Sequence, residues 1–200
     1  MITTQKVRDK DAREELRARY KPATVKILFV SETPPSGDAF FYRANSRLYK
    51  FTQEAFAEVY GEERCGEGEQ FLEFFKAQGC YLDDLCLDSI NHLDEKMKKQ
   101  MWRQGVAPLA ERIRRMEPKP LRCIVVVKRI EWSVRSALQQ AEASMIPLSS
   151  ITFPNPQYGL HKKYVRELIH ILRELIKNKI LDDPKNLDEP TFIIKSLATQ

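Results

Sequence analysis

The sequence is poor in the side chains that build metal centres, with 4 cysteines and 3 histidines in 200 residues. Its cysteines form no C-x-x-C pair, which is the spacing typical of zinc and iron–sulfur sites. We therefore predict reduced, structural thiols and no metal or cofactor, with a metal or iron–sulfur role as the less favoured alternative. The four are Cys65, Cys80, Cys86 and Cys123.

Long apolar runs are also lacking. No window approaches the roughly 20 apolar residues that a membrane-spanning helix needs. Residues 1–20 are polar and charged, without the apolar core of a secretory signal. We therefore expect no contact with a membrane and a cytoplasmic location, or one in a nucleus or nucleoid.

Three common catalytic motifs are absent. The sequence has no G-x-S-x-G nucleophile turn and no G-x-x-x-x-G-K-[ST] phosphate loop, which count against serine hydrolases and P-loop enzymes. It also lacks H-x-E with C-x-x-C, which counts against a zinc deaminase. Another α/β hydrolase or nucleotide-binding protein stays open as a less favoured class.

The composition is that of a globular protein with a basic surface. Hydrophobic residues make up 42% and charged residues 30% of the chain, and the net charge is +5. This length is enough for one domain with a sizeable core. We predict a single domain over 1–180 and a C-terminal tail over 181–200, with apolar residues 192–194 as a candidate docking arm. The positive charge permits binding to phosphate groups.

Strand and helix patterns alternate along the chain. Short β-branched runs bounded by turn residues predict four strands, and apolar residues at helical spacing predict the helices between them. This order predicts an α/β fold, a three-layer α/β/α sandwich with a four-stranded parallel central sheet. The predicted strands are 24–30, 80–86, 121–127 and 147–153. The predicted helices are 9–20, 46–60, 71–75, 94–116, 132–143 and 160–180, with Ser46 as a cap and a kink or break at Gly105 and Pro108.

The loops that leave the four strands carry polar, charged and aromatic side chains. Right-handed crossovers bring these loops to one edge of a parallel sheet, where α/β proteins bind ligands. The first loop places Glu32 there, and the third places Lys128 and Arg129. We therefore expect the ligand site at the carboxyl edge of the sheet. The loops span 31–42, 85–92, 128–131 and 154–161.

The ordered set of motifs resembles the uracil-DNA glycosylase superfamily. The similar segments are ILFVSETPP at 27–35, YLDDL at 81–85, IVVV at 124–127 and TFPNP at 152–156. Together they span most of the chain, from residue 25 to 172. The resemblance implies the same three-layer fold, DNA as the partner, and a pocket that accepts a base flipped out of the duplex.

The first two motifs imply a catalytic carboxylate and a base-binding surface. Glu32 matches the residue that orients the attacking water, with Ser31 in place of a glycine. Phe41 is the candidate ring for stacking on the base, with Phe40 and Tyr42 as alternatives. Asp84 stands where the family carries an asparagine that reads the base edge. Core packing of the rings and a purely structural strand end at Asp84 remain the competing interpretations.

The last motif departs from the family pattern. Phe153 occupies the place of a histidine that stabilises the departing base, so Asn155 or the loop backbone is the candidate donor, with His161 nearby. The candidate phosphate-binding residues are Lys128, Arg129, Lys162 and Lys163.

Two functions follow from the resemblance. One is a DNA glycosylase-like hydrolase that cleaves the N-glycosidic bond of an altered or mispaired base. The other is a non-catalytic nucleic-acid or nucleotide-binding module on the same fold, which the missing histidine favours. Both require Glu32 and Asn155 to share one cleft.

Overall fold

The computed structural model describes the backbone of residues 2–187 and, within that range, the side chains of 10–155 and 157–187. The tail expected at 181–200 therefore lies mostly outside the described residues, as does its candidate docking segment. None of the described helices is long and apolar enough to cross a bilayer.

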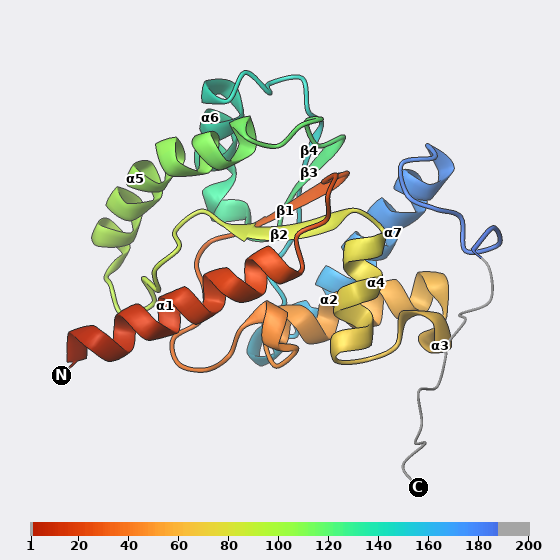
Figure 1. Cartoon of the computed structure of the whole chain (residues 1–200), viewed down its shortest axis with the longest axis horizontal. Coiled ribbons are helices and arrows are strands. Elements are labelled where there is room, and N and C mark those ends of the chain that lie inside the picture. Colours follow the sequence, from red (N-terminus) through yellow and green to blue (C-terminus); the bar gives the residue numbers. More distant parts are fainter. Residues whose placement is uncertain (1, 188–200) are drawn as a thin grey trace, which may run out of the picture.

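The core of the molecule is a four-stranded sheet in the order β2-β1-β3-β4, with every pairing parallel (Figure 1). The predicted four-stranded parallel sheet is thus confirmed. Each strand is shorter than expected, because the flanking residues turn away to form the loops at the sheet edges. The strands are β1 Ile27–Ser31, β2 Cys80–Asp84, β3 Arg122–Val125 and β4 Leu148–Ser150.

Helices cover both faces of this sheet. In Figure 1, α5 and α6 lie on one side and α1, α2, α4 and α7 on the other, which confirms the three-layer sandwich. The helices are α1 Ile2–Arg19, α2 Arg47–Tyr60, α3 Glu62–Cys65, α4 Glu69–Ala77, α5 Glu95–Arg114, α6 Glu131–Gln140 and α7 Leu160–Lys177. Short 3-10 turns are η1 Phe41–Arg43, η2 Lys128–Ile130 and η3 Pro156–Tyr158.

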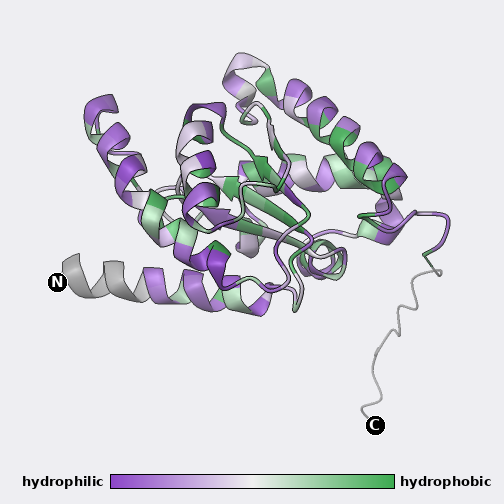
Figure 2. Ribbon diagram, turned by 90° about the horizontal axis from the view of Figure 1, so that it is seen from above, coloured by the Kyte–Doolittle hydropathy of each residue, from purple (hydrophilic) through white to green (hydrophobic). Residues whose placement is uncertain are grey.

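The central strands are buried on both sides, which explains their continuous apolar sequence. Every residue of β1 is buried, and so are the last three of β3. Hydrophobic ribbon lies in the middle of the molecule and hydrophilic ribbon mostly on the outer helices (Figure 2). The buried apolar side chains form one hydrophobic cluster.

The open edge of strand β2 is covered by the Tyr42 side chain. The Tyr42 hydroxyl donates to the Leu82 carbonyl at 2.9 Å, and it accepts from the Leu82 amide at 2.7 Å. These bonds occupy backbone groups that an edge strand would otherwise leave open to another chain. Tyr42 is therefore a structural residue of the sheet edge.

Helix α5 differs from expectation. Of the predicted kink or break at Gly105 and Pro108, the break is wrong, because one helix runs through both residues. Burial on both sides of the proline, at Val106 and Leu109, holds the helix against the sheet layer although Pro108 cannot donate a backbone hydrogen bond. The predicted cap of α2 is confirmed: the Ser46 hydroxyl accepts from the Tyr49 amide at 3.1 Å.

Candidate functional site

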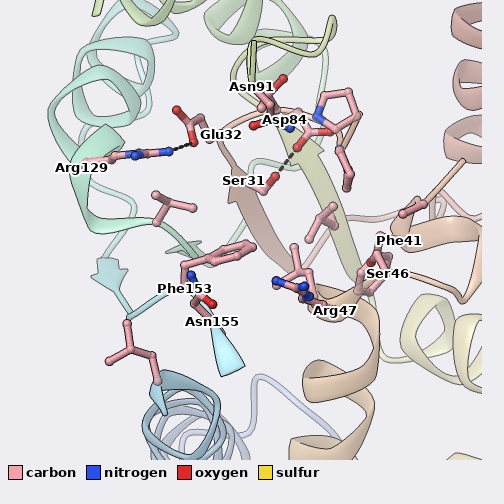
Figure 3. A pocket seen from close by; sticks show the side chains of 18 of the residues that line it. Ser31, Glu32, Phe41, Ser46, Arg47, Asp84, Asn91, Arg129, Phe153 and Asn155 are labelled. Carbon is pink, nitrogen blue, oxygen red and sulfur yellow. Dashed lines mark hydrogen bonds and ion pairs between the residues drawn. The ribbon is translucent and has the colours of Figure 1, made fainter. Parts of the chain in front are cut away.

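A cavity of about 670 Å³ opens at the carboxyl edge of the sheet. Its lining includes Glu32 from the loop after β1, Asp84 at the end of β2, Arg129 after β3 and Asn155 after β4 (Figure 3). The meeting of the Glu32 and Asn155 loops, on which both functions depend, is therefore confirmed. The volume falls within the range of small-molecule sites.

Glu32 is a buried carboxylate of the cavity wall with a partner on each oxygen. It is 6% exposed, and its Oε1 accepts from Nε1 of Trp102 at 2.9 Å. Its Oε2 pairs with Nη2 of Arg129, whose guanidinium also lies 5.5 Å from the Trp102 ring centre. Each oxygen thus has one partner, and these two contacts fix the orientation of the carboxylate.

Arg129 lies in the cavity wall and pairs with Glu32. Its predicted contact with a DNA phosphate stays a prediction. Its charge is offset by that pair and by Glu95, 3.9 Å from Nη1. No local pattern indicates this pair, because Glu32 and Arg129 are far apart along the chain.

Asp84 lies at the cavity wall and also belongs to a buried ionic network. Ser31 donates to its Oδ1 and Arg17 to its Oδ2. Asp83 accepts from Nε of Arg112 at 2.8 Å and lies 3.6 Å from Nη1 of Arg17. Burial by itself lowers the pKa of Arg17, but the charges of Asp84 and Asp83 raise it above its ordinary value. Asp84 is therefore both a member of this network and part of the cavity wall, and its reading of a base edge stays a prediction.

The three candidate rings separate in the structure. Among the described residues, Phe41 lines the cavity whereas Phe40 and Tyr42 do not. Phe41 is 2% exposed and packs edge-on against Tyr42 and Tyr49, with ring centres 5.2 and 5.9 Å apart. It therefore forms a wall of the cavity from within the core.

Two aromatic side chains at the cavity were missed. Phe153 is 38% exposed and Tyr158 is 70% exposed, and both line the cavity. Exposed rings beside a cavity are suited to stacking on a planar ligand. Their position in or next to the loop after the fourth strand could have identified them from the sequence. The family comparison treats Phe153 only as the replacement of a histidine.

Asn155 organises the turn that leads into α7. Its Oδ1 accepts from the Gln157 amide at 3.1 Å, and its carbonyl accepts from the Leu160 amide at 3.0 Å. Within the part of the chain whose side chains are described, its Nδ2 has no acceptor, so this group is available to a ligand. His161 does not line the cavity and packs on the Phe51 ring, 5.2 Å between centres.

Of the four cations predicted to bind phosphate, Arg129 lines the cavity and the three lysines do not. Lys128, Lys162 and Lys163 are exposed and are not part of its lining. Arg47, at the start of α2, lines the cavity, and no acidic oxygen of the described residues lies within 4.0 Å of its guanidinium. Its position directly after the Ser46 helix cap is the sequence feature that could have identified it.

No cluster of three metal-ligating side chains occurs among the described residues. The four cysteines are buried and free. Comparison with protein-family models and with curated proteins found no match to this chain.

Proposed function

We propose that this protein is a uracil-DNA glycosylase-like hydrolase that cleaves the N-glycosidic bond of an altered or mispaired base in DNA. One observation carries the proposal: a single cavity at the carboxyl edge of the sheet joins the buried Glu32 to Asn155 and the exposed ring of Phe153. A carboxylate can stabilise the sugar cation, an amide donor can stabilise the departing base, and a ring can stack on it.

Hydrolysis requires charge stabilisation at two places. As the bond between C1′ of the sugar and the base nitrogen breaks, its electron pair leaves with the base and positive charge develops on the sugar. The oxygen of water bonds to C1′, and one proton of that water passes to the base. Each Glu32 oxygen keeps a second lone pair beside its present partner, so the carboxylate can orient the water and stabilise the sugar cation.

The remaining cavity residues suit the rest of a nucleotide. The free Nδ2 of Asn155 can donate to the departing base, and Phe153 can stack on it. Arg47 supplies a cation without an acidic partner among the described residues, which suits a phosphate next to the flipped base.

The alternative is a non-catalytic nucleic-acid or nucleotide-binding module on the same fold. The observation that favours it is the pairing of Glu32 with both Trp102 and Arg129. A carboxylate held in this way can serve as a structural anchor between the loop after β1 and α5.

The two functions differ in whether abasic sites form. Oligonucleotides that each carry one altered or mispaired base are incubated with the protein, and abasic sites are then cleaved with alkali and counted. We expect release from at least one substrate and a loss of about 100-fold or more in Glu32→Gln. The glutamine keeps an acceptor for Trp102 and removes the charge.

Glu174→Gln is the matched control. Glu174 also pairs with an arginine, Arg122, but does not line the cavity, so its substitution should leave release unchanged. Thermal unfolding of both variants checks that they fold. Undiminished release by a folded Glu32→Gln protein would remove Glu32 from the reaction. Saturable binding without abasic product on any substrate would establish the binding module.

A further inference from the structure

The cavity wall between β1 and β2 consists of a serine and an aspartate that face each other in register. Ser31 and Asp84 are partners in the β1–β2 pairing, both line the cavity, and both are buried. Figure 3 shows their hydrogen bond beside the Glu32–Arg129 pair.

Neither side chain of this wall has a hydrogen left to donate to a ligand. A serine hydroxyl has a single hydrogen, and that of Ser31 points to Oδ1 of Asp84. The Asp84 carboxylate carries no hydrogen and receives a second bond from Arg17. Toward the cavity, these two side chains therefore offer lone pairs and no donor.

The negative charge of the wall is held in place by the buried network. Arg17 is 2% exposed, and Arg112 completes a set of two arginines and two aspartates with Asp83 and Asp84. An arginine stays protonated in proteins, so its partners remain charge-matched as carboxylates. A neutral Asp84 that could donate would leave a buried guanidinium without its counter-charge.

We propose that Asp84 and Ser31 select a base that presents an amino group, of the adenine or cytosine type, over the matching base with a carbonyl oxygen at that place. This inference rests on the proposed function for the statement that the cavity holds a base, but it does not require hydrolysis.

The selection follows from hydrogen-bond matching. The N6 amino group of adenine and the N4 amino group of cytosine are donors, whereas hypoxanthine and uracil carry an acceptor oxygen there. An amino group gains a charge-assisted bond to the carboxylate. A carbonyl oxygen would be desolvated against another acceptor, and a site built to bond a donor rejects the analogue that lacks it.

Binding of nucleoside monophosphates to the whole protein tests the inference without any reaction. The pairs AMP against IMP and CMP against UMP each exchange an amino for an oxo group, and each carries a phosphate that Arg47 can bind. We expect isothermal titration calorimetry to give a dissociation constant about tenfold or more lower for the amino member of each pair. Equal or tighter binding of IMP and UMP, or no binding of any of the four, overturns the inference.

Two variants assign the preference to the wall. Asp84→Asn adds an amide donor, so the AMP-to-IMP preference should fall at least tenfold. Asp182→Asn makes the same change in an aspartate that pairs with Lys26, outside both the network and the cavity lining, and should keep the preference. An unchanged preference in a folded Asp84→Asn protein overturns the assignment. If that variant does not fold, the wild-type comparison still decides the inference.

The inference and the proposed function fail in different ways. Tighter binding of AMP and CMP with no abasic product on any oligonucleotide upholds the amino selection and contradicts the hydrolase. Abasic product together with tighter binding of IMP and UMP upholds the hydrolase and contradicts the amino selection.

Discussion

At the scale of single residues, the partner of each side chain decides what that side chain can do. Glu32, Asp83 and Asp84 are three buried carboxylates near one sheet edge, and each is matched by an arginine from another element. Pairing fixes their orientation and leaves a limited set of lone pairs for a ligand. The chemical role of a carboxylate in a loop can therefore be assigned only when its hydrogen-bond and ionic partners are known.

The buried thiols give a pH dependence that belongs to this scale. Burial raises the pKa of the Cys65, Cys86 and Cys123 thiols from 9.0 to about 12. The folded protein keeps these protons where the unfolded chain loses them, so their stabilisation is complete below pH 9.0 and is lost as the pH rises toward about 12.

We expect the free energy of unfolding, measured by urea denaturation in a pH series, to fall above about pH 9. Cys123→Ala should reduce the steepness of that fall, because one titrating thiol is removed. A free energy of unfolding that stays constant from pH 9 upward would contradict the raised thiol pKa values.

At the scale of elements, helix α5 holds several residues of the cavity wall in place. It carries Trp102, which bonds Glu32, and Arg112, which donates to Asp83 and to the Asp84 carbonyl at 2.6 Å. The close packing of this helix against the loop after β2 depends on Gly105. A Cβ atom at that residue would lie 2.7 Å from the Leu85 carbonyl oxygen, in the loop directly after Asp84.

Gly105→Ala should therefore destabilise the protein although alanine is the better helix former by about 1 kcal/mol. The clash is with backbone, so we expect a net loss of roughly 1–3 kcal/mol in the free energy of unfolding. Gln104→Ala, at an exposed position of the same turn, should be neutral within about 0.5 kcal/mol. Urea denaturation of both variants measures this, and a Gly105→Ala protein as stable as wild type would refute the close contact.

At the scale of the whole molecule, the arrangement of helices decides which cations surround the cavity. Helices α2 and α7 pack against each other, and their first residues, Arg47 and Leu160, both line the cavity. Lys162 and Lys163 stand in the first turn of α7 and are exposed. Both lysines therefore follow closely after Leu160, which lines the cavity.

Removal of Lys162 and Lys163 tests whether these lysines hold DNA phosphates. The double variant Lys162→Gln/Lys163→Gln should weaken DNA binding and lower the slope of log K against log salt by about 1 to 2. The change Lys177→Gln/Lys179→Gln removes the same charge at the other end of α7 and should alter the slope little. Fluorescence anisotropy across a salt series gives both slopes, and equal effects of the two variants would argue against a phosphate site at the start of α7.

Local sequence patterns were enough to predict the fold. Period and turn chemistry are local properties, so the apolar run of β1, the turn after it and the alternation of strands with helices specify a parallel sheet whose loops meet at one edge. Glu32 and Asn155 could be placed at that edge on this basis, in the loops after the first and last strands, whereas Asp84 was singled out by the family resemblance. The surroundings of these residues became visible with the packed structure. They include the pairing of Glu32 with Arg129, the position of Arg47 in the cavity and the hydrogen bonds of Tyr42 to the edge strand. These contacts join residues far apart in the chain, and their geometry depends on how helices pack on the sheet, which no local pattern encodes.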